Sequence, residues 1–300
     1  MADDPSWPRA STWLTSSTAR LSADPPELPE LILIGVPAHR TSISPTRSDR
    51  TPAAVRSVLA RFSTWVGSAA VDVSELAVLD LGDVLDPDGP DGEATTQAQV
   101  ARFPETPLVA LGGDNSITVA VARGRRVDGL VTLDAHHDLR DGQSNGSPVR
   151  RLVEGGLAGR HVVQVGIADF ANSREYAARA RDLGITVIHR EALDRRPMDD
   201  VMAEALAIAS GGSGDARVHV DLDVDVCDRS VAPACPASLP GGISAAQLRS
   251  AARAAGADPS VVSIDLTEVD ATADSTDQRT VRLVALCVLE VAAGVLLRRA

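Results

Sequence analysis

Residues 129–138 read GLVTLDAHHD, a short apolar run that ends abruptly in two carboxylates and two imidazoles. The run predicts a buried strand, because strands of parallel sheets are apolar on both faces. Residues two apart in an extended chain share a face, so Asp134, His136 and Asp138 point to one side and His137 to the other. Such a group at the end of a buried strand needs a cation. The stretch therefore predicts half of a metal site.

The rest of the chain alternates short β-branched runs with amphipathic stretches rich in alanine and arginine. This alternation predicts right-handed crossovers and a mainly parallel sheet with helices on both faces, which is an α/β fold. Residues 1–28 predict a partly ordered arm, residues 29–300 a single domain, and residues 86–93 and 211–215 surface loops. We expect strands over 31–36, 76–81, 107–111, 129–134, 161–167, 186–189, 217–224 and 261–266, and helices over 51–62, 97–103, 117–123, 148–154, 173–182, 198–209, 245–255 and 277–297.

Composition excludes several classes of partner. The 300 residues carry a net charge of −12, so we expect neither nucleic acid nor an anionic membrane surface as a partner. The three cysteines are odd in number and lack CxxC spacing, which favours a reducing compartment such as the cytoplasm. The N-terminus lacks the apolar stretch of a signal peptide. The apolar run 283–297 is shorter than the ~20 residues of a spanning helix, and Glu290 interrupts it, so it predicts a buried C-terminal helix.

A second acidic strand end lies at residues 221–228, which read DLDVDVCD. Asp221, Asp223 and Asp225 alternate with apolar residues, so all three share one face. Like charges stacked in this way repel each other unless a metal neutralises them. Ligands of open parallel sheets bind beyond the carboxyl ends of the strands, so this face and residues 134–138 are expected to meet. Oxygen ligands without sulfur favour Mn²⁺ or Mg²⁺ over a structural zinc, and bridging carboxylates suit two ions.

Two other strand ends carry weaker signals. GGDNS at 112–116 follows a predicted strand, and by itself it is typical of an Asx turn or a helix N-cap. SIDLTEVD at 263–270 ends the last strand, and a lone glutamate such as Glu268 is usually a surface residue. Together with the two acidic strand ends, however, these segments add Glu268 and Asn115 to the residues expected in one crevice.

The four motifs in this order resemble the ureohydrolase superfamily, which includes arginases, agmatinases and formimidoylglutamases. The resemblance covers nearly the whole chain, including IGVP at 34–37 and LGDV at 81–84. It implies a three-layer αβα fold around an eight-stranded, mainly parallel sheet, a binuclear manganese site, and trimers or hexamers. Asp134 and Asp223 would bridge the two Mn²⁺ ions of each subunit, and a register that uses Asp221 with Asp223 stays open. The implied ligands are Asn115, Asp134, His136, Asp138, Asp223 and Asp225.

Three positions depart from the family pattern. Asn115 replaces a metal-binding histidine, and because an amide oxygen is a weaker, neutral donor, we expect one ion to be held loosely. Asn145 stands where many guanidino hydrolases have a histidine that moves protons, which an amide cannot do. Arg229 replaces a usual proline, with no predicted effect.

The resemblance also implies a reaction, the hydrolysis of a linear amidine. Asp138 would hydrogen-bond the attacking hydroxide and pass its proton to the leaving amine, and Glu268 would pair with the cationic amidine. Arg140 is suited to gripping a carboxylate, with Arg150 and Arg47 as further candidates. This favours N-formimidoyl-L-glutamate, hydrolysed to glutamate and formamide in histidine degradation. The residues expected to bind substrate are Arg140, Asn145, Ser147, Asp169 and Glu268.

Two other functions stay open. One is an amidinohydrolase of a guanidino compound, of the agmatinase, guanidinobutyrase or arginase type, which would release urea. The other is a metal-poor homologue without catalytic activity, because Asn115 and Asn145 both depart from the pattern. The released product separates the first alternative from a formimidoylglutamase, and metal content separates the second from both enzymes.

Overall fold

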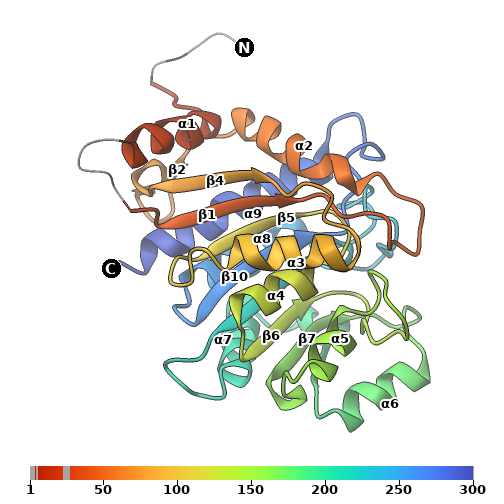
Figure 1. Ribbon diagram of the computed structural model, residues 1–300. Helices are drawn as coiled ribbons and strands as arrows, with labels where there is room; N and C mark the ends of the chain where they lie inside the picture. The colour runs from red at the N-terminus through yellow and green to blue at the C-terminus, as the bar shows by residue number, and fades with distance from the viewer. Residues whose placement is uncertain (1–3, 5, 23–27, 300) are drawn as a thin grey trace.

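The computed structural model describes residue 4, residues 6–22 and residues 28–299. Its centre is an eight-stranded sheet in the order β4-β1-β5-β10-β9-β6-β7-β8, in which every neighbouring pair is parallel (Figure 1). The predicted parallel α/β sheet is confirmed. The strands are β1 (Leu31–Val36), β4 (Val78–Asp83), β5 (Leu108–Gly112), β6 (Gly129–Leu133), β7 (Val162–Ile167), β8 (Thr186–His189), β9 (Val218–Asp223) and β10 (Val261–Thr267).

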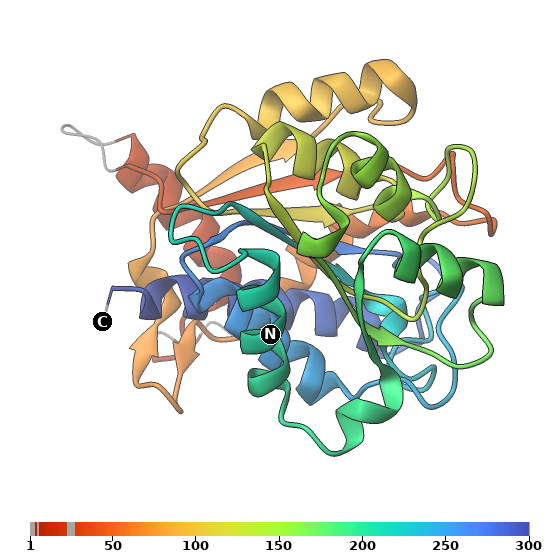
Figure 2. The ribbon, with the colours of Figure 1, turned by 90° about the horizontal axis from the view of Figure 1, so that it is seen from below.

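Helices cover both faces of this sheet, which confirms the three-layer αβα arrangement. Figure 2 shows the sheet between the two helical layers, with yellow α3 on one side and dark blue α9 on the other. One layer comprises α1 (Ala10–Leu21), α2 (Thr51–Val58), α7 (Met198–Ala209), α8 (Ala245–Ala257) and α9 (Arg279–Leu297). The other comprises α3 (Gly89–Val100), α4 (Ile117–Arg125), α5 (Pro148–Glu154) and α6 (Arg174–Asp182).

Shorter elements connect these layers. A two-stranded hairpin pairs β2 (Trp65–Val66) with β3 (Val71–Asp72). The 3-10 turns are η1 (Ser48–Arg50), η2 (Leu59–Arg61), η3 (Val73–Glu75), η4 (Gly159–His161), η5 (Arg190–Asp194) and η6 (Val224–Val226).

The C-terminal helix α9 is a core element, as predicted. Among the described residues it is the one helix long and apolar enough to cross a membrane, but 83% of its apolar window is buried inside the protein. Its close approach to α8 depends on two glycines. A Cβ at Gly294 would lie 2.4 Å from the carbonyl oxygen of Arg253, and a Cβ at Gly256 would lie 2.3 Å from that of Val291.

Two segments contain helix that the sequence analysis did not predict. The described part of the N-terminal arm contains α1, which is anchored by Trp13. This side chain is 1% exposed and donates from Nε1 to the Leu76 carbonyl at 2.9 Å. Helix α3 begins at Gly89, inside the predicted 86–93 loop, because Pro90 stands in the first turn, where its missing N–H costs nothing. Residues 1–3, 5 and 23–27 of the predicted arm lie outside the described residues.

A column of buried polar residues on the α4 side of the sheet leads to its carboxyl edge. Side chains of β9 alternate, so His219, Asp221 and Asp223 face α4 while Val220 and Leu222 join the opposite core. Residues in register on β10 face the same way, with Asp265 beside Asp221. All eight strands end at one edge, so the segments after β5, β6, β9 and β10 meet at the end of this column.

Candidate metal centre and substrate pocket

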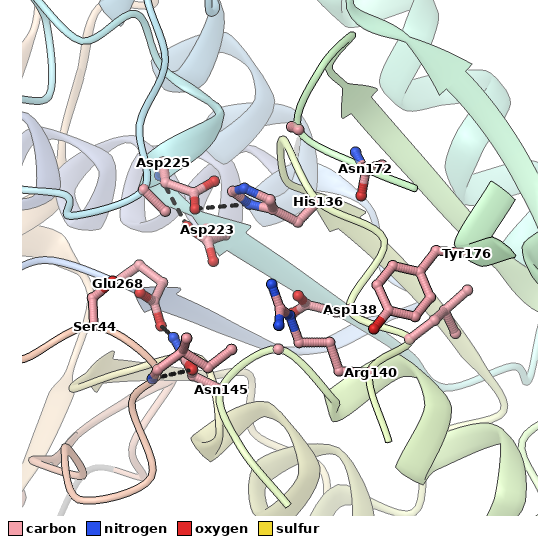
Figure 3. A pocket seen from close by; sticks show the side chains of 15 residues that line it. Ser44, His136, Asp138, Arg140, Asn145, Asn172, Tyr176, Asp223, Asp225 and Glu268 are labelled. Carbon is pink, nitrogen blue, oxygen red and sulfur yellow. Dashed lines mark hydrogen bonds and ion pairs between the residues drawn. The ribbon is translucent and has the colours of Figure 1, made fainter. Parts of the chain in front are cut away.

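A pocket of about 160 Å³ opens at the carboxyl ends of the central strands (Figure 3). It is lined by residues from segments that are far apart in the sequence, and most of the predicted site residues are among them. These are His136 and Asp138 after β6, Arg140 and Asn145 in the following loop, Asp223 and Asp225 at the end of β9, and Glu268 after β10.

Three predicted ligands converge on one point at the base of this pocket. His136 Nδ1 lies 3.2 Å from Asp134 Oδ1 and 3.1 Å from Asp225 Oδ2, so the three ligand atoms could share one ion. The turn η6 brings Asp225 to this position, because Asp223 Oδ1 accepts a 2.9 Å hydrogen bond from the Asp225 backbone N–H and caps the turn. Both aspartates of the ion pairs are at most 3% exposed.

The electrostatics of this cluster fit a divalent cation. Burial and the nearby Asp225 raise the pKa of Asp134 to about 6, and burial raises the pKa values of Asp138 and Asp223 well above their usual range. Burial opposes a charged imidazole, but the neighbouring carboxylates outweigh it and raise the pKa of His136 to about 12. The acids thus need positive charge that the chain supplies only in part, and a hard cation bound by oxygen and nitrogen donors would provide it.

Stabilisation of the protein by Mn²⁺ is expected to increase with pH. Near pH 7 the metal-free folded chain keeps protons on His136 and Glu268, whose pKa values are about 12 and about 8, but the unfolded chain has lost most of them. The free energy of unfolding therefore falls as pH rises from about 5 to about 8. Mn²⁺ replaces protons at its ligands, so the rise in Tm on adding Mn²⁺ should be larger at about pH 8 than at about pH 6.

The measurement is a pair of thermal melts with and without Mn²⁺ at each pH. Asp134→Asn is the control variant, because it lacks one carboxylate of the cluster and should show little Mn²⁺ response at either pH. Equal Tm shifts of the unmodified protein at both pH values would contradict the coupling between metal and protons.

Asn115 has a different orientation from that expected of a metal ligand. Its Nδ2 donates to Asp138 Oδ2 at 2.7 Å. Its Oδ1 accepts hydrogen bonds from the hydroxyls of Thr118 at 2.7 Å and Thr267 at 3.3 Å. In this arrangement the amide oxygen faces the two threonine hydroxyls and not the carboxylates of Asp134 and Asp225. Asn115 orients the Asp138 carboxylate instead.

The structure favours one of the two registers for the acidic strand. Asp223 and Asp225 line the pocket, and Asp225 contacts His136. Asp221 lies one row deeper on β9, is 1% exposed, and pairs in register with Asp265 of β10. Asp223 and Asp225 therefore face the pocket, and Asp221 lies behind them.

Glu268 lines the pocket on the same side as Asp223 and Asp225 (Figure 3), and two hydrogen bonds hold its side chain. Its Oε1 accepts from the Asn115 backbone N–H at 2.7 Å and from Asn145 Nδ2 at 2.8 Å. Burial and the nearby Asp114 outweigh these bonds and raise the pKa of Glu268 to about 8. A cationic group in the pocket would favour the ionised carboxylate, so Glu268 is placed to bind one. Asn145 is thereby a positioning residue for Glu268.

Of the three candidate arginines, Arg140 alone is available in the pocket. Its guanidinium has no carboxylate partner among the described residues, and Figure 3 shows it entering the pocket. Arg47 pairs with Asp49 outside the pocket. Arg150 donates from Nε to the Arg140 carbonyl at 2.6 Å and also binds Glu154, so it supports the loop.

Two predicted substrate residues lie elsewhere. Ser147 is buried at the start of α5 and donates to the Ser144 carbonyl at 2.8 Å, which fixes the loop rather than lining the pocket. Asp169 lines a neighbouring cavity with Arg190, on the other side of Asp225. Sequence motifs also missed the wall formed by Ala171, Asn172 and Tyr176. The one sequence feature that could have pointed to this wall is that Tyr176 is the single tyrosine of the chain.

Comparison with known proteins agrees with this geometry. The model of the arginase family matches residues 29–294. The chain belongs to the arginase family. It is 36% identical over 258 residues to a formimidoylglutamase of Halalkalibacterium halodurans, a match that covers 81% of this chain and 80% of that protein.

Solved structures of the arginase fold are also similar. Formimidoylglutamase from Bacillus subtilis superposes with a TM-score of 0.87 at 27% identity, covering 98% of this chain and 94% of that one. Formiminoglutamase from Trypanosoma cruzi, solved with Mn²⁺, gives a TM-score of 0.81 at 22% identity, covering 96% and 98%. At that identity the second match supports the fold alone.

Proposed function

We propose that this arginase-family protein hydrolyses N-formimidoyl-L-glutamate to L-glutamate and formamide. The observation that carries the proposal is the pairing of opposite charges in one pocket. Glu268 offers a buried carboxylate to the amidine cation, and Arg140 offers an unpaired guanidinium to a carboxylate tail. A dicarboxylate that bears an amidine satisfies both, and the similarity to formimidoylglutamases supports this substrate.

The metal proposed for this site is a pair of Mn²⁺ ions in each subunit. Such a pair, when bound, supplies an activated water nucleophile and stabilises developing negative charge. The donor set consists of buried carboxylates and one imidazole without sulfur, which suits Mn²⁺, and a solved protein of this fold holds that ion. Because the Asn115 oxygen is directed to two threonines, we propose that one ion has fewer protein ligands and binds more weakly. The proposed ligands are Asp134, His136, Asp138, Asp223 and Asp225.

Asp138 and Glu268 have distinct proposed roles in this reaction. Asp138 is proposed to take a proton from the attacking water and give it to the leaving nitrogen. Asn115 fixes its orientation through the 2.7 Å hydrogen bond to Oδ2. Glu268 holds the amidine, which keeps the carbon to be attacked close to the acid cluster.

The alternative substrate with the most support is a guanidino acid. It carries the same two charges as formimidoylglutamate and would therefore fit Glu268 and Arg140, but its hydrolysis releases urea. A cationic tail such as that of agmatine would meet Arg140 with the same charge. A non-catalytic role is disfavoured, because buried, repelling acids destabilise a chain that has no use for them.

The test is a comparison of kcat/KM on Mn²⁺-loaded protein for formimidoylglutamate, 4-guanidinobutyrate, arginine and agmatine. Formamide release from formimidoylglutamate at the highest kcat/KM is the expected outcome. Preferential release of urea from a guanidino compound would refute the proposed substrate. It would still agree with the broader activity, the hydrolysis of a C–N bond of an amidine.

Arg140→Gln is expected to raise KM for formimidoylglutamate about 10- to 100-fold, because it removes a charge-assisted bond worth about 1.5–3 kcal/mol. The kcat value should change little, since the bond is made in the ground state as well as the transition state. Arg174→Gln is the matched control, as it removes an exposed arginine from nearby α6 that does not line the pocket. Equal effects of the two substitutions on KM would contradict a specific role for Arg140.

We also propose that residues 29–300 act as one catalytic domain, in the cytoplasm and as a homo-oligomer. Cys227, Cys235 and Cys287 are buried and unpaired, as expected in a reducing compartment. Size-exclusion chromatography with light scattering would test for the trimer or hexamer.

A further inference from the structure

Tyr176 is the chain's one tyrosine, in a sequence with only 2% aromatic residues, and it lines the substrate pocket. It belongs to α6, whereas the acid cluster and Arg140 belong to segments after β6, β9 and β10. Its hydroxyl has no hydrogen-bond partner among the residues that the structure describes. Figure 3 shows its hydroxyl end turned to the side of the pocket on which Arg140 lies. A phenol at a pocket wall is a hydrogen-bond donor available to a ligand.

Arg179 connects Tyr176 to the loop that carries Arg140. Its guanidinium carbon lies 5.8 Å from the centre of the Tyr176 ring, within the range of a cation–π contact. The same guanidinium donates from Nη1 to the Leu139 carbonyl at 2.5 Å and to Asp141 Oδ1 at 2.9 Å. Leu139 and Asp141 flank Arg140 in sequence. The phenol and the loop are therefore held by one side chain.

The loop also fixes the stem of Arg140 and leaves its head free. The Arg140 backbone N–H donates to the Gly146 carbonyl at 2.9 Å, and its carbonyl accepts from Arg150 Nε at 2.6 Å. The arginine stem packs closely over Gly146, where a Cβ would lie 2.7 Å from Arg140 Cδ. Two fixed segments thus present a guanidinium and a phenol to the same pocket, neither of which has an acceptor of its own in the described structure.

We propose that Tyr176 is a specificity-determining residue, whose hydroxyl donates a hydrogen bond to the substrate carboxylate that Arg140 binds. The inference rests on the proposed function, because it assumes a carboxylate-bearing amidine. A carboxylate has two oxygens and about four lone-pair positions, so it can accept from the guanidinium and the phenol together. An ammonium tail has no acceptor for either group and would be repelled by Arg140.

Tyr176→Phe keeps the ring and its packing and removes only the hydroxyl. We expect KM for formimidoylglutamate to rise about tenfold with kcat nearly constant. The kcat/KM for N-butylformamidine, an amidine without a carboxylate, should not change. A purely structural role would affect both substrates in parallel, and that result, or an unchanged KM for formimidoylglutamate, would overturn the proposal.

The double variant tests whether both donors bind one carboxylate. If they do, Tyr176→Phe in the Arg140→Gln background should raise KM by clearly less than the tenfold effect of the single variant, because the carboxylate is no longer held in place. Additive effects of the two substitutions on KM would overturn the inference that Arg140 and Tyr176 bind the same carboxylate.

A binding measurement separates this inference from the proposed function. L-Glutamate added to the Mn²⁺-loaded protein should produce a tyrosine difference spectrum, since no tryptophan lines the pocket. Absence of that spectrum in the unmodified protein would overturn the role of Tyr176. Failure to hydrolyse formimidoylglutamate would refute the proposed function, whereas the spectrum decides the carboxylate contact independently.

Discussion

Asp225→Asn is expected to remove bound Mn²⁺ and lower kcat/KM by about a thousandfold. Asp225 Oδ2 lies 3.1 Å from His136 Nδ1, so the substitution removes a carboxylate from the point where the candidate ligands converge. It also leaves the half-buried imidazole of His136 without one of its two anionic partners. Breaking a buried charge pair costs about 3–5 kcal/mol, which corresponds to about three orders of magnitude in an equilibrium constant. Metal content after dialysis and kcat/KM are the two readouts.

Asp221→Asn is the matched control for this substitution. It has the same chemistry, on the same stretch of chain and at similar burial, but Asp221 lies one row below the pocket and pairs with Asp265. Burial and Asp265 raise the pKa of Asp221 well above its usual range, so a neutral asparagine resembles its protonated form. The variant should keep its metal and most of its activity. Loss of metal from Asp221→Asn, together with retention of metal by Asp225→Asn, would establish the alternative register, in which Asp221 and Asp223 are the ligands.

Glu268→Gln is expected to reduce kcat/KM for formimidoylglutamate about 10²- to 10³-fold while leaving the metal content unchanged. The substitution keeps the shape of the side chain and removes the charge that pairs with the amidine cation. Loss of one partner from a buried, hydrogen-bonded charge pair costs about 2–5 kcal/mol, and tenfold corresponds to about 1.4 kcal/mol. Initial rates and metal analysis on the same preparation provide the measurement.

Glu290→Gln is a suitable control for Glu268→Gln. Glu290 is 6% exposed and Glu268 is 7% exposed, so both are buried glutamates. Glu290, however, pairs with Arg249 and Arg253 between α8 and α9, away from the pocket. Its substitution should lower Tm and leave kcat/KM near that of the unmodified protein. A similar loss of activity in both variants would mean that Glu268 acts through stability rather than through the substrate.

The parts of the site that the sequence predicted are those set by local geometry. β6 ends at Leu133 and β9 at Asp223, so Asp134, His136 and Asp225 are placed by the short turns that directly follow these strands. The parallel sheet then brings the strand ends together. For the same reason the strands themselves were predicted well, since their apolar runs are continuous and their ends are marked by polar residues.

The parts that could not be predicted depend on contacts between distant segments. The orientation of the Asn115 amide is decided by Thr118 and by Thr267, which is 152 residues further along the chain. Tyr176 enters the pocket from α6 without any motif around it. The predicted roles of Ser147 and Asp169 rested on sequence position alone, and the local turns direct these two side chains elsewhere.

Identifying which bond of formimidoylglutamate breaks tests the proposed reaction most directly. Substrate labelled with ¹³C at the amidine carbon would be incubated with the Mn²⁺-loaded protein and followed by NMR. If Glu268 holds the terminal amidine nitrogen and Asp138 protonates the nitrogen of the glutamate moiety, all of the label should appear in formamide and unlabelled L-glutamate should form in equal amount. Label in N-formylglutamate with release of ammonia, or no conversion by protein shown to contain Mn²⁺, would contradict the account.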